Sequence, residues 1–281
     1  MNRLRHVLWL MPLLLYSSDA LAWGLYTHVY FAQQLVWAIP LADPRFRRAA
    51  RALPGWLTAG ACLPDLSLTG HYAGTQELRL THQWDTAQAM LERACSDEER
   101  AISLGFVSHL LVDIIAHNHF VPAHERMWLH LPVLTHASAE WAMDAHLKHH
   151  VVASPAHLLR QHQLGLAHFA VEHFRCSHAE AERALVLLAH GEAVLRRSRL
   201  AEGLYGTAKV LDRNVKRRFN YYLRETSRRL VQVNQMLAGR QPAWQAEPPL
   251  PGLAHERVRR HTSRQIKYRL PLPLDLFLEV E

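Results

Sequence analysis

The chain has 281 residues, a net charge of +7 and only three cysteines. This length suits one large domain with a sizeable core, and so few cysteines exclude a disulfide framework or a cysteine-based metal knuckle. Histidine is the unusual component: the chain contains 21, and neutral imidazole is the commonest metal ligand that proteins offer. The basic charge is compatible with anionic lipid, nucleic acid or phosphorylated substrates, and does not choose between them.

The first 22 residues have the features of a secretory signal. Two arginines precede an apolar run at 8–16, and the ALA segment at 20–22 fits the small-residue rule for cleavage. We therefore expect residues 1–22 to be removed and the mature protein to be secreted or periplasmic. Cleavage after Ala22 makes Trp23 the mature N-terminus, so that its backbone amine and carbonyl become candidate metal ligands beside His28.

The chain that follows predicts an all-α fold. Two N-cap residues each precede a proline, at 43–44 and 154–155, and two capping boxes begin at Ser96 and Ser177. Apolar residues then recur with helical periodicity, and convincing strand alternation is nearly absent. The pattern predicts a multi-helix bundle in one domain over 23–240, with helices near 26–38, 44–53, 86–94, 97–118, 136–151, 156–174, 178–197 and 208–237.

The composition changes from residue 241 onward. Prolines interrupt the segment 242–251, and a basic run at 255–269 follows. Prolines at 271 and 273 argue against a regular central strand. We expect residues 241–281 to form an irregular, Pro-rich and basic C-terminal tail.

Candidate metal ligands recur on the predicted helix 97–118. His109, Asp113 and His117 are four residues apart, so their side chains project from one helical face. Such a face can hold more than one metal ion. His119, two residues further on, is an alternative ligand to His117 if the backbone turns there.

Neighbouring segments offer similar groups. His136, Glu140 and Asp144 repeat the four-residue spacing on the next helix. Asp65 follows a proline in a loop, and His82 precedes a helix start. A histidine and an acid at this spacing are often only a surface pair, so each piece by itself is a weak signal.

The order of these residues along the chain resembles that of the zinc-dependent phospholipase C family and its relatives, the fungal three-zinc nucleases. In that superfamily an N-terminal Trp, several histidines and a few carboxylates bind three zinc ions in an all-helical domain. The resemblance covers residues 23–150 by motif, and implies the same fold and up to three zinc ions here.

The resemblance also implies three ligand sets that share one carboxylate. The ligands of the first zinc are Asp65, His82, His109 and Asp113. The ligands of the second are Trp23, through its amine and carbonyl, His28 and the bridging Asp113. The ligands of the third are His136, Glu140 and one histidine from the 117–119 segment.

The histidine of the third site is open to two readings. The well-known enzymes of the superfamily place it six residues after the bridging Asp, which selects His119. Here the proline that lies between the two in those enzymes is missing, and His117 continues the helical face. We favour His117 and keep His119 as its rival.

Paired metal ions can activate a water molecule and clamp the attacking and leaving oxygens of a phosphodiester. We assign catalytic roles to Asp113, as the bridge, and to Asp65, as a ligand that also accepts the proton of the water. The role of Asp65 as a base is implied by the resemblance alone.

Three functions fit these observations. The leading one is an exported phospholipase C-like hydrolase of phospholipids or related phosphodiesters, with peripheral contact to an anionic membrane surface and no obligate protein partner. The second is a single-strand nuclease with the same zinc cluster, because the spacing from Trp23 to His28 is closer to the nucleases, whereas Glu140 is closer to the phospholipases. The third is a histidine-rich metal-binding protein without catalysis.

Overall fold

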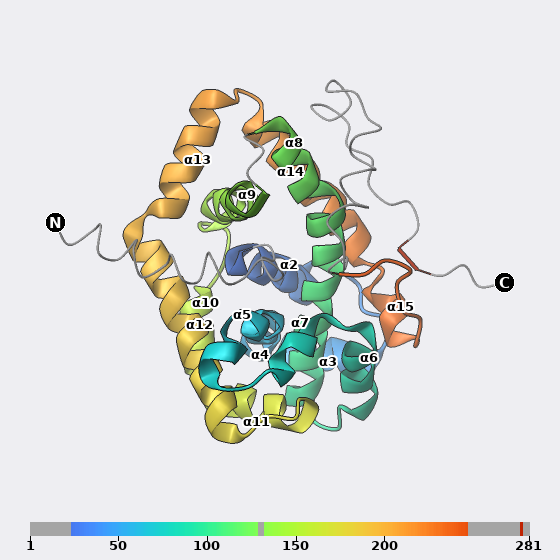
Figure 1. Cartoon of the computed structure of the whole chain (residues 1–281). Helices are drawn as coiled ribbons and strands as arrows, with labels where there is room; N and C mark the ends of the chain where they lie inside the picture. The colour runs from blue at the N-terminus through green and yellow to red at the C-terminus, as the bar shows by residue number, and fades with distance from the viewer. Residues whose placement is uncertain (1–23, 129–131, 247–275, 278–281) are drawn as a thin grey trace.

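The computed structural model describes residues 24–128, 132–246 and 276–277. Within these ranges the regular secondary structure is helical, and the contact between Pro242 and Phe277 is an isolated antiparallel bridge (Figure 1). The prediction of an all-α bundle is confirmed. The expected signal peptide 1–22, Trp23 and most of the expected tail lie outside the described residues.

The helices of the N-terminal half are α2 (Leu25–Trp37), α3 (Pro44–Ala52), α4 (Pro54–Gly60), α5 (Ser67–Ala73), α6 (Trp84–Arg93) and α7 (Asp97–Ile115). Those of the C-terminal half are α8 (Val121–Met127), α9 (Pro132–Leu147), α10 (Pro155–Gln161), α11 (Gln163–His173), α12 (His178–Ser198), α13 (Leu200–Leu211), α14 (Val215–Leu230) and α15 (Val233–Leu237). Short 3₁₀ turns, Pro64–Leu66 and Glu77–His82, flank α5.

Helix α7 is the core of the protein. The capping box of Ser96 and Glu99 starts it, and every residue from 101 to 115 is buried. Helices α2, α3, α4, α6 and α14 pack around it. The stretch Asp97–Met127 is long and apolar enough to cross a membrane by length and composition, but its apolar window is entirely buried inside the protein.

The helix predicted to end near residue 118 continues further. A π-helical turn, Ala116–Phe120, joins α7 to α8, and the N–H of Val121 donates to the carbonyl of Ala116. Pro122 lacks an N–H, and its ring crowds the carbonyl four residues earlier in a regular α-helix. The wider turn accommodates this proline, so α7 and α8 remain one rod with His117 and His119 in the widened part.

Other helices differ from the predicted bounds. The segment 156–174 divides into α10 and α11 around His162, and 208–237 divides among α13, α14 and α15. At Asp212 the carboxylate accepts from the N–H of Asn214 at 3.0 Å, a local bond that competes with helix continuation. The helices α4 and α5 are too short to give a periodic signal in the sequence.

Two glycines allow α4 and α7 to cross at close range. A Cβ at Gly105 would overlap the carbonyl of Leu57, and a Cβ at Gly60 would overlap the carbonyl of Ile102. This crossing holds the segment after α4 against α7. The carbonyl of Ala61 thereby reaches the side chain of His109, at 2.8 Å from its Nδ1.

We expect Gly105→Ala to lower the free energy of unfolding by about 2 kcal/mol, because an added methyl group overpacks the crossing. Gly191→Ala is the matched control, since Gly191 lies inside α12 and a methyl group added there would meet no other part of the protein within 4 Å. There the better helix propensity of alanine should raise stability by up to about 1 kcal/mol. Urea unfolding measures both, and equal effects would contradict the packing argument.

Candidate metal centre

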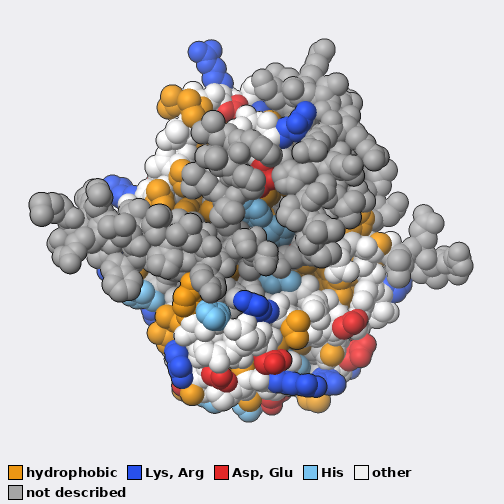
Figure 2. Space-filling model, viewed as in Figure 1, with side chains coloured by type: hydrophobic (Ala, Val, Ile, Leu, Met, Phe, Trp, Pro, Cys, Tyr) orange, Lys and Arg blue, Asp and Glu red, His pale blue; other side chains and the backbone are white. Residues whose placement is uncertain are grey.

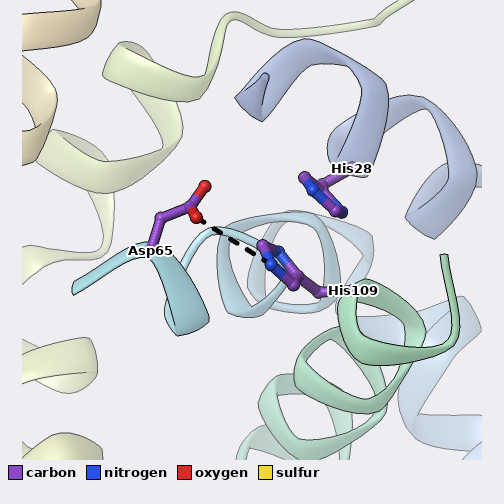
Figure 3. Close-up of side chains that lie close together, drawn as sticks. All are labelled: His28, Asp65 and His109. Atoms are coloured by element: carbon purple, nitrogen blue, oxygen red, sulfur yellow. Dashed lines mark ion pairs between the residues drawn. The ribbon is translucent and has the colours of Figure 1, made fainter. Parts of the chain in front are cut away.

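The described ligands predicted for the first two zinc ions lie together at the centre of the bundle. They come from α2, the two 3₁₀ turns and α7, and all are buried. They are His28, Asp65, His82, His109 and Asp113. Figure 3 shows three of them, His28, Asp65 and His109, converging from separate elements. Residues distant in the sequence thus meet in one small volume.

Asp113 is at the middle of this group. Its Oδ1 lies 3.4 Å from His28 Nε2, and its Oδ2 lies 2.9 Å from His109 Nε2. His82 Nε2 is 3.5 Å from the same Oδ2. Asp65 Oδ1 lies 3.9 Å from the same nitrogen of His109. A carboxylate facing imidazoles from separate elements has the arrangement that a bridging ligand needs.

Hydrogen bonds behind the imidazoles determine which nitrogen faces the group. His109 Nδ1 donates to the carbonyl of Ala61 at 2.8 Å. The hydroxyl of Thr81 donates to the carbonyl of Pro64 at 2.6 Å, and therefore accepts from His82 Nδ1 at 3.1 Å. In their neutral forms both histidines then direct the lone pair of Nε2 into the group.

These lone pairs face one another. His82 Nε2 lies 3.3 Å from His109 Nε2. Among the described residues, neither carboxylate oxygen of Asp113 and neither ring nitrogen of His28 has a hydrogen-bond partner. Buried acceptors at such distances repel unless a cation lies among them. Imidazole nitrogens and carboxylate oxygens are zinc ligands, so this donor set fits zinc.

The electrostatics keep these groups in their metal-binding forms. Burial lowers the pKa of His28 well below its usual value, and nearby His109 lowers it further. Burial opposes ionisation of Asp113, but His109 and His28 outweigh burial and hold the pKa of its carboxyl well below the usual range. Burial also lowers the pKa of His117 to about 3. At neutral pH the imidazoles of His28 and His117 are therefore neutral and Asp113 is ionised.

A second ligand group adjoins the first. Ligand atoms of His117, His136 and Glu140 all lie within 4.8 Å of one another. His136 Nε2 is 3.0 Å from Glu140 Oε1, and His117 Nε2 is 3.9 Å from Asp113 Oδ1. Burial, with the charge of Asp113 adding to it, raises the pKa of Glu140 well above its usual value. A metal cation there would favour the ionised carboxylate.

His119 has a different neighbour. Its ring lies 5.8 Å from the ring of Trp244, at the start of the C-terminal segment. Neither ligand group among the described residues includes it. The geometry therefore places His117, and not His119, beside His136 and Glu140. The identity of the ligand itself stays a prediction.

The sequence reasoning missed groups that support the centre. Glu125 on α8 is buried, and its Oε1 lies 3.8 Å from His136 Nδ1. Its position eight residues after His117 on one rod was an available signal. Thr81, directly before His82, was another. The carbonyl of Ala61 gave no signal, because a backbone acceptor leaves no trace in the side chains.

Asp144 was grouped with His136 and Glu140 by its spacing, but the structure assigns it to another task. Its carboxylate caps the start of α2, accepting from the N–H groups of Tyr26 at 3.2 Å and Thr27 at 2.9 Å. Arg196 Nη2 donates to the same carboxylate at 3.0 Å. A carboxylate satisfies the open N–H groups of a helix start and interacts favourably with its dipole. His28 follows Thr27 directly, so this contact fixes the position of a candidate ligand.

A comparison with known families gives a match to one of them. The family described as zinc dependent phospholipase C matches residues 27–228. The chain belongs to the zinc-dependent phospholipase C family. A comparison with curated proteins and with solved structures finds no match. The resemblance inferred from the order of ligands is confirmed, and the matched range contains every candidate ligand that the structure describes.

We expect Thr81→Val to weaken zinc binding at least about tenfold, because groups that orient a ligating histidine typically contribute that much to metal affinity. The valine keeps the shape of threonine but removes the acceptor behind His82. Thr81→Ser retains the hydroxyl and is the control. Competition with a chromophoric chelator measures the affinity, and an unchanged value in the valine variant would refute the proposed role of the hydroxyl.

The buried pair of Glu192 and Arg196 predicts a pH dependence of stability. Glu192 accepts from Arg196 Nε at 2.6 Å, yet burial raises the pKa of Glu192 from 4.5 to about 7. A carboxyl with a raised pKa binds a proton more tightly in the folded state, so its contribution to stability falls as pH rises from about 4.5 to above 7. This group should lower the free energy of unfolding between pH 5 and pH 8 by at most about 3 kcal/mol.

Glu192→Gln should reduce that difference, since the amide oxygen still accepts from Arg196 but does not titrate. Urea unfolding of both proteins at the two pH values, in excess zinc, measures it. Comparing the proteins cancels the pH dependence of zinc binding. An identical pH dependence in the two proteins would exclude a contribution from Glu192.

Proposed function

We propose that this protein is an exported zinc-dependent phosphodiester hydrolase that cleaves phospholipids as a phospholipase C does. The observation that carries the proposal is the junction of the two ligand groups at Asp113, with His109 Nε2 at 2.9 Å and His117 Nε2 at 3.9 Å. Membership of the zinc-dependent phospholipase C family supports the metal and the class of substrate.

The chain has residues for each part of this chemistry. The first group, around Asp113, and the second group, around Glu140, would each hold zinc. Zinc supplies activation of water and neutralisation of phosphoryl charge at such a site. Asp113 orients the imidazoles around it. Asp65 is buried beside His109, where its carboxylate is suited to accept a proton from the attacking water.

The exposure of the ligands indicates where substrate enters. The side chain of His136 is 21% exposed, whereas that of His82 is 5% exposed and that of His109 is fully buried. Substrate therefore approaches from the side of α9. The phosphoryl group would reach the second ligand group first, with the deeper carboxylates behind it.

Export is part of the proposal. Removal of residues 1–22 would make Trp23 the first residue, directly before Gly24 and the start of α2. Its free amine would then be available as a ligand on the same short segment as His28. Mass spectrometry of the N-terminus of the exported protein tests this step, and a mature chain that retains Ala22 would rule it out.

The function itself is tested on the purified, exported protein. Bound zinc is counted, and hydrolysis of a chromogenic phosphocholine ester is measured beside degradation of single-stranded DNA. We expect stoichiometric zinc and ester hydrolysis. Asp113→Asn should lower hydrolysis at least about 100-fold, since removing a group that stabilises the transition state costs that much or more. Preferred cleavage of DNA would identify a nuclease, and zinc without either activity would identify a binding protein.

A matched pair of variants tests the third ligand set. His117→Ala should lose one zinc ion, because its ring belongs to the group with His136 and Glu140. His119→Ala should keep the full number, since its ring lies beside Trp244. Metal analysis of both variants shows which of the two histidines is the ligand. The opposite pattern would make His119 the ligand.

A further inference from the structure

The corner between α13 and α14 exposes two adjacent aliphatic side chains. Val210 is 80% exposed and Leu211 is 81% exposed, at the last two positions of α13. These side chains add almost nothing to the core. Exposed apolar residues that occur singly are common and need no explanation, so the meaning of this pair depends on its surroundings.

The surroundings are strongly basic. Exposed cationic side chains flank the pair, and they are Lys209, Arg213, Lys216 and Arg217. Between residues 203 and 224 the sequence has one acid, Asp212. Its carboxylate forms an ion pair with the buried Arg218, which compensates its charge. In Figure 2 hydrophobic and basic side chains lie together at the top of the molecule, over this corner.

We propose that this basic corner, residues 209–217, docks the protein onto a membrane that contains anionic lipid. An aliphatic pair that inserts at the boundary of headgroups and acyl chains, surrounded by cations that contact phosphates, is typical of peripheral membrane binding. Single-stranded nucleic acid would use the cations, but it typically binds by stacking its bases on aromatic rings, which an aliphatic pair does not supply. The apolar pair therefore favours lipid.

The helix that ends at this corner packs against α9, the helix that carries His136. Lys148 Nζ lies 2.7 Å from Glu202 Oε1, and His146 Nδ1 lies 2.7 Å from the hydroxyl of Tyr205. The end of α9 thus contacts the first half of α13, whose other end carries the exposed pair. A role of the corner in supplying lipid to the metal centre deepens the proposed function and rests on it. Binding of the corner to a membrane does not rest on the proposed function.

Two double variants test the docking on the mature, zinc-loaded protein. Lys216→Glu with Arg217→Glu reverses charge, and Val210→Ser with Leu211→Ser removes the aliphatic pair. Sedimentation with vesicles of phosphatidylcholine and phosphatidylglycerol measures binding, beside vesicles of phosphatidylcholine alone. We expect wild type to prefer the anionic vesicles, and each double variant to bind them at least about tenfold more weakly.

Matched variants elsewhere serve as controls. Arg47→Glu with Arg51→Glu makes the same charge change at exposed positions of α3, and Leu164→Ser removes an aliphatic side chain that is 70% exposed on α11. Both controls should bind vesicles nearly as wild type does. Wild-type binding by the corner variants, or equal losses in the controls, would overturn the proposal. So would a single-stranded oligonucleotide that binds wild type and competes with the vesicles for the corner.

The docking and the proposed chemistry fail separately. Hydrolysis of a water-soluble phosphocholine ester should be equal in wild type and both corner variants, because the corner holds no candidate ligand. Hydrolysis of vesicle lipid should fall in the corner variants alone. If no protein hydrolyses either substrate, the proposed function is wrong, and vesicle binding still decides the docking.

Discussion

The structure depends on a buried carboxylate, Asp113, enclosed by imidazoles in the middle of a helical bundle. A charge in this position is costly unless it is compensated. His109 and His82 already donate hydrogen bonds from their outer nitrogens, to the carbonyl of Ala61 and to the hydroxyl of Thr81. Their inner nitrogens bring further lone pairs to the carboxylate. A metal cation among these groups would relieve the repulsion, and metal binding and folding would then draw on the same groups.

The rod formed by α7 and α8 places these groups. It carries ligands from both groups on one face, and the π-helical turn lets it pass Pro122 without ending. The close crossing of α4 and α7 at Gly60 and Gly105 places the backbone that follows α4 behind His109. On the opposite side, Asp144 and Arg196 hold the start of α2 so that His28 enters the centre. Contacts from α2, α4 and the rod thus hold the ligands of the metal centre in position.

This construction relates the family to the proposed function. The zinc-dependent phospholipase C family accounts for the ligand order, and the partly exposed side chain of His136 is the basis for the proposed direction of substrate approach. The basic corner at the end of α13 belongs to none of the ligand groups. Its proposed role is to hold the protein at a lipid surface, so that the residues that bind the membrane differ from those that hold the metal ions.

The sequence alone determined the helical fold and the candidate ligands. Caps and periodicity are local properties, and a four-residue spacing places His109 and Asp113 on one face whatever surrounds them. Only the tertiary structure decided which groups meet. His117 lies with His136 because α9 packs against the rod that carries His117. Asp144 has the spacing of a ligand but caps α2, because the partner of a side chain is set by the element packed against it and not by its own helix.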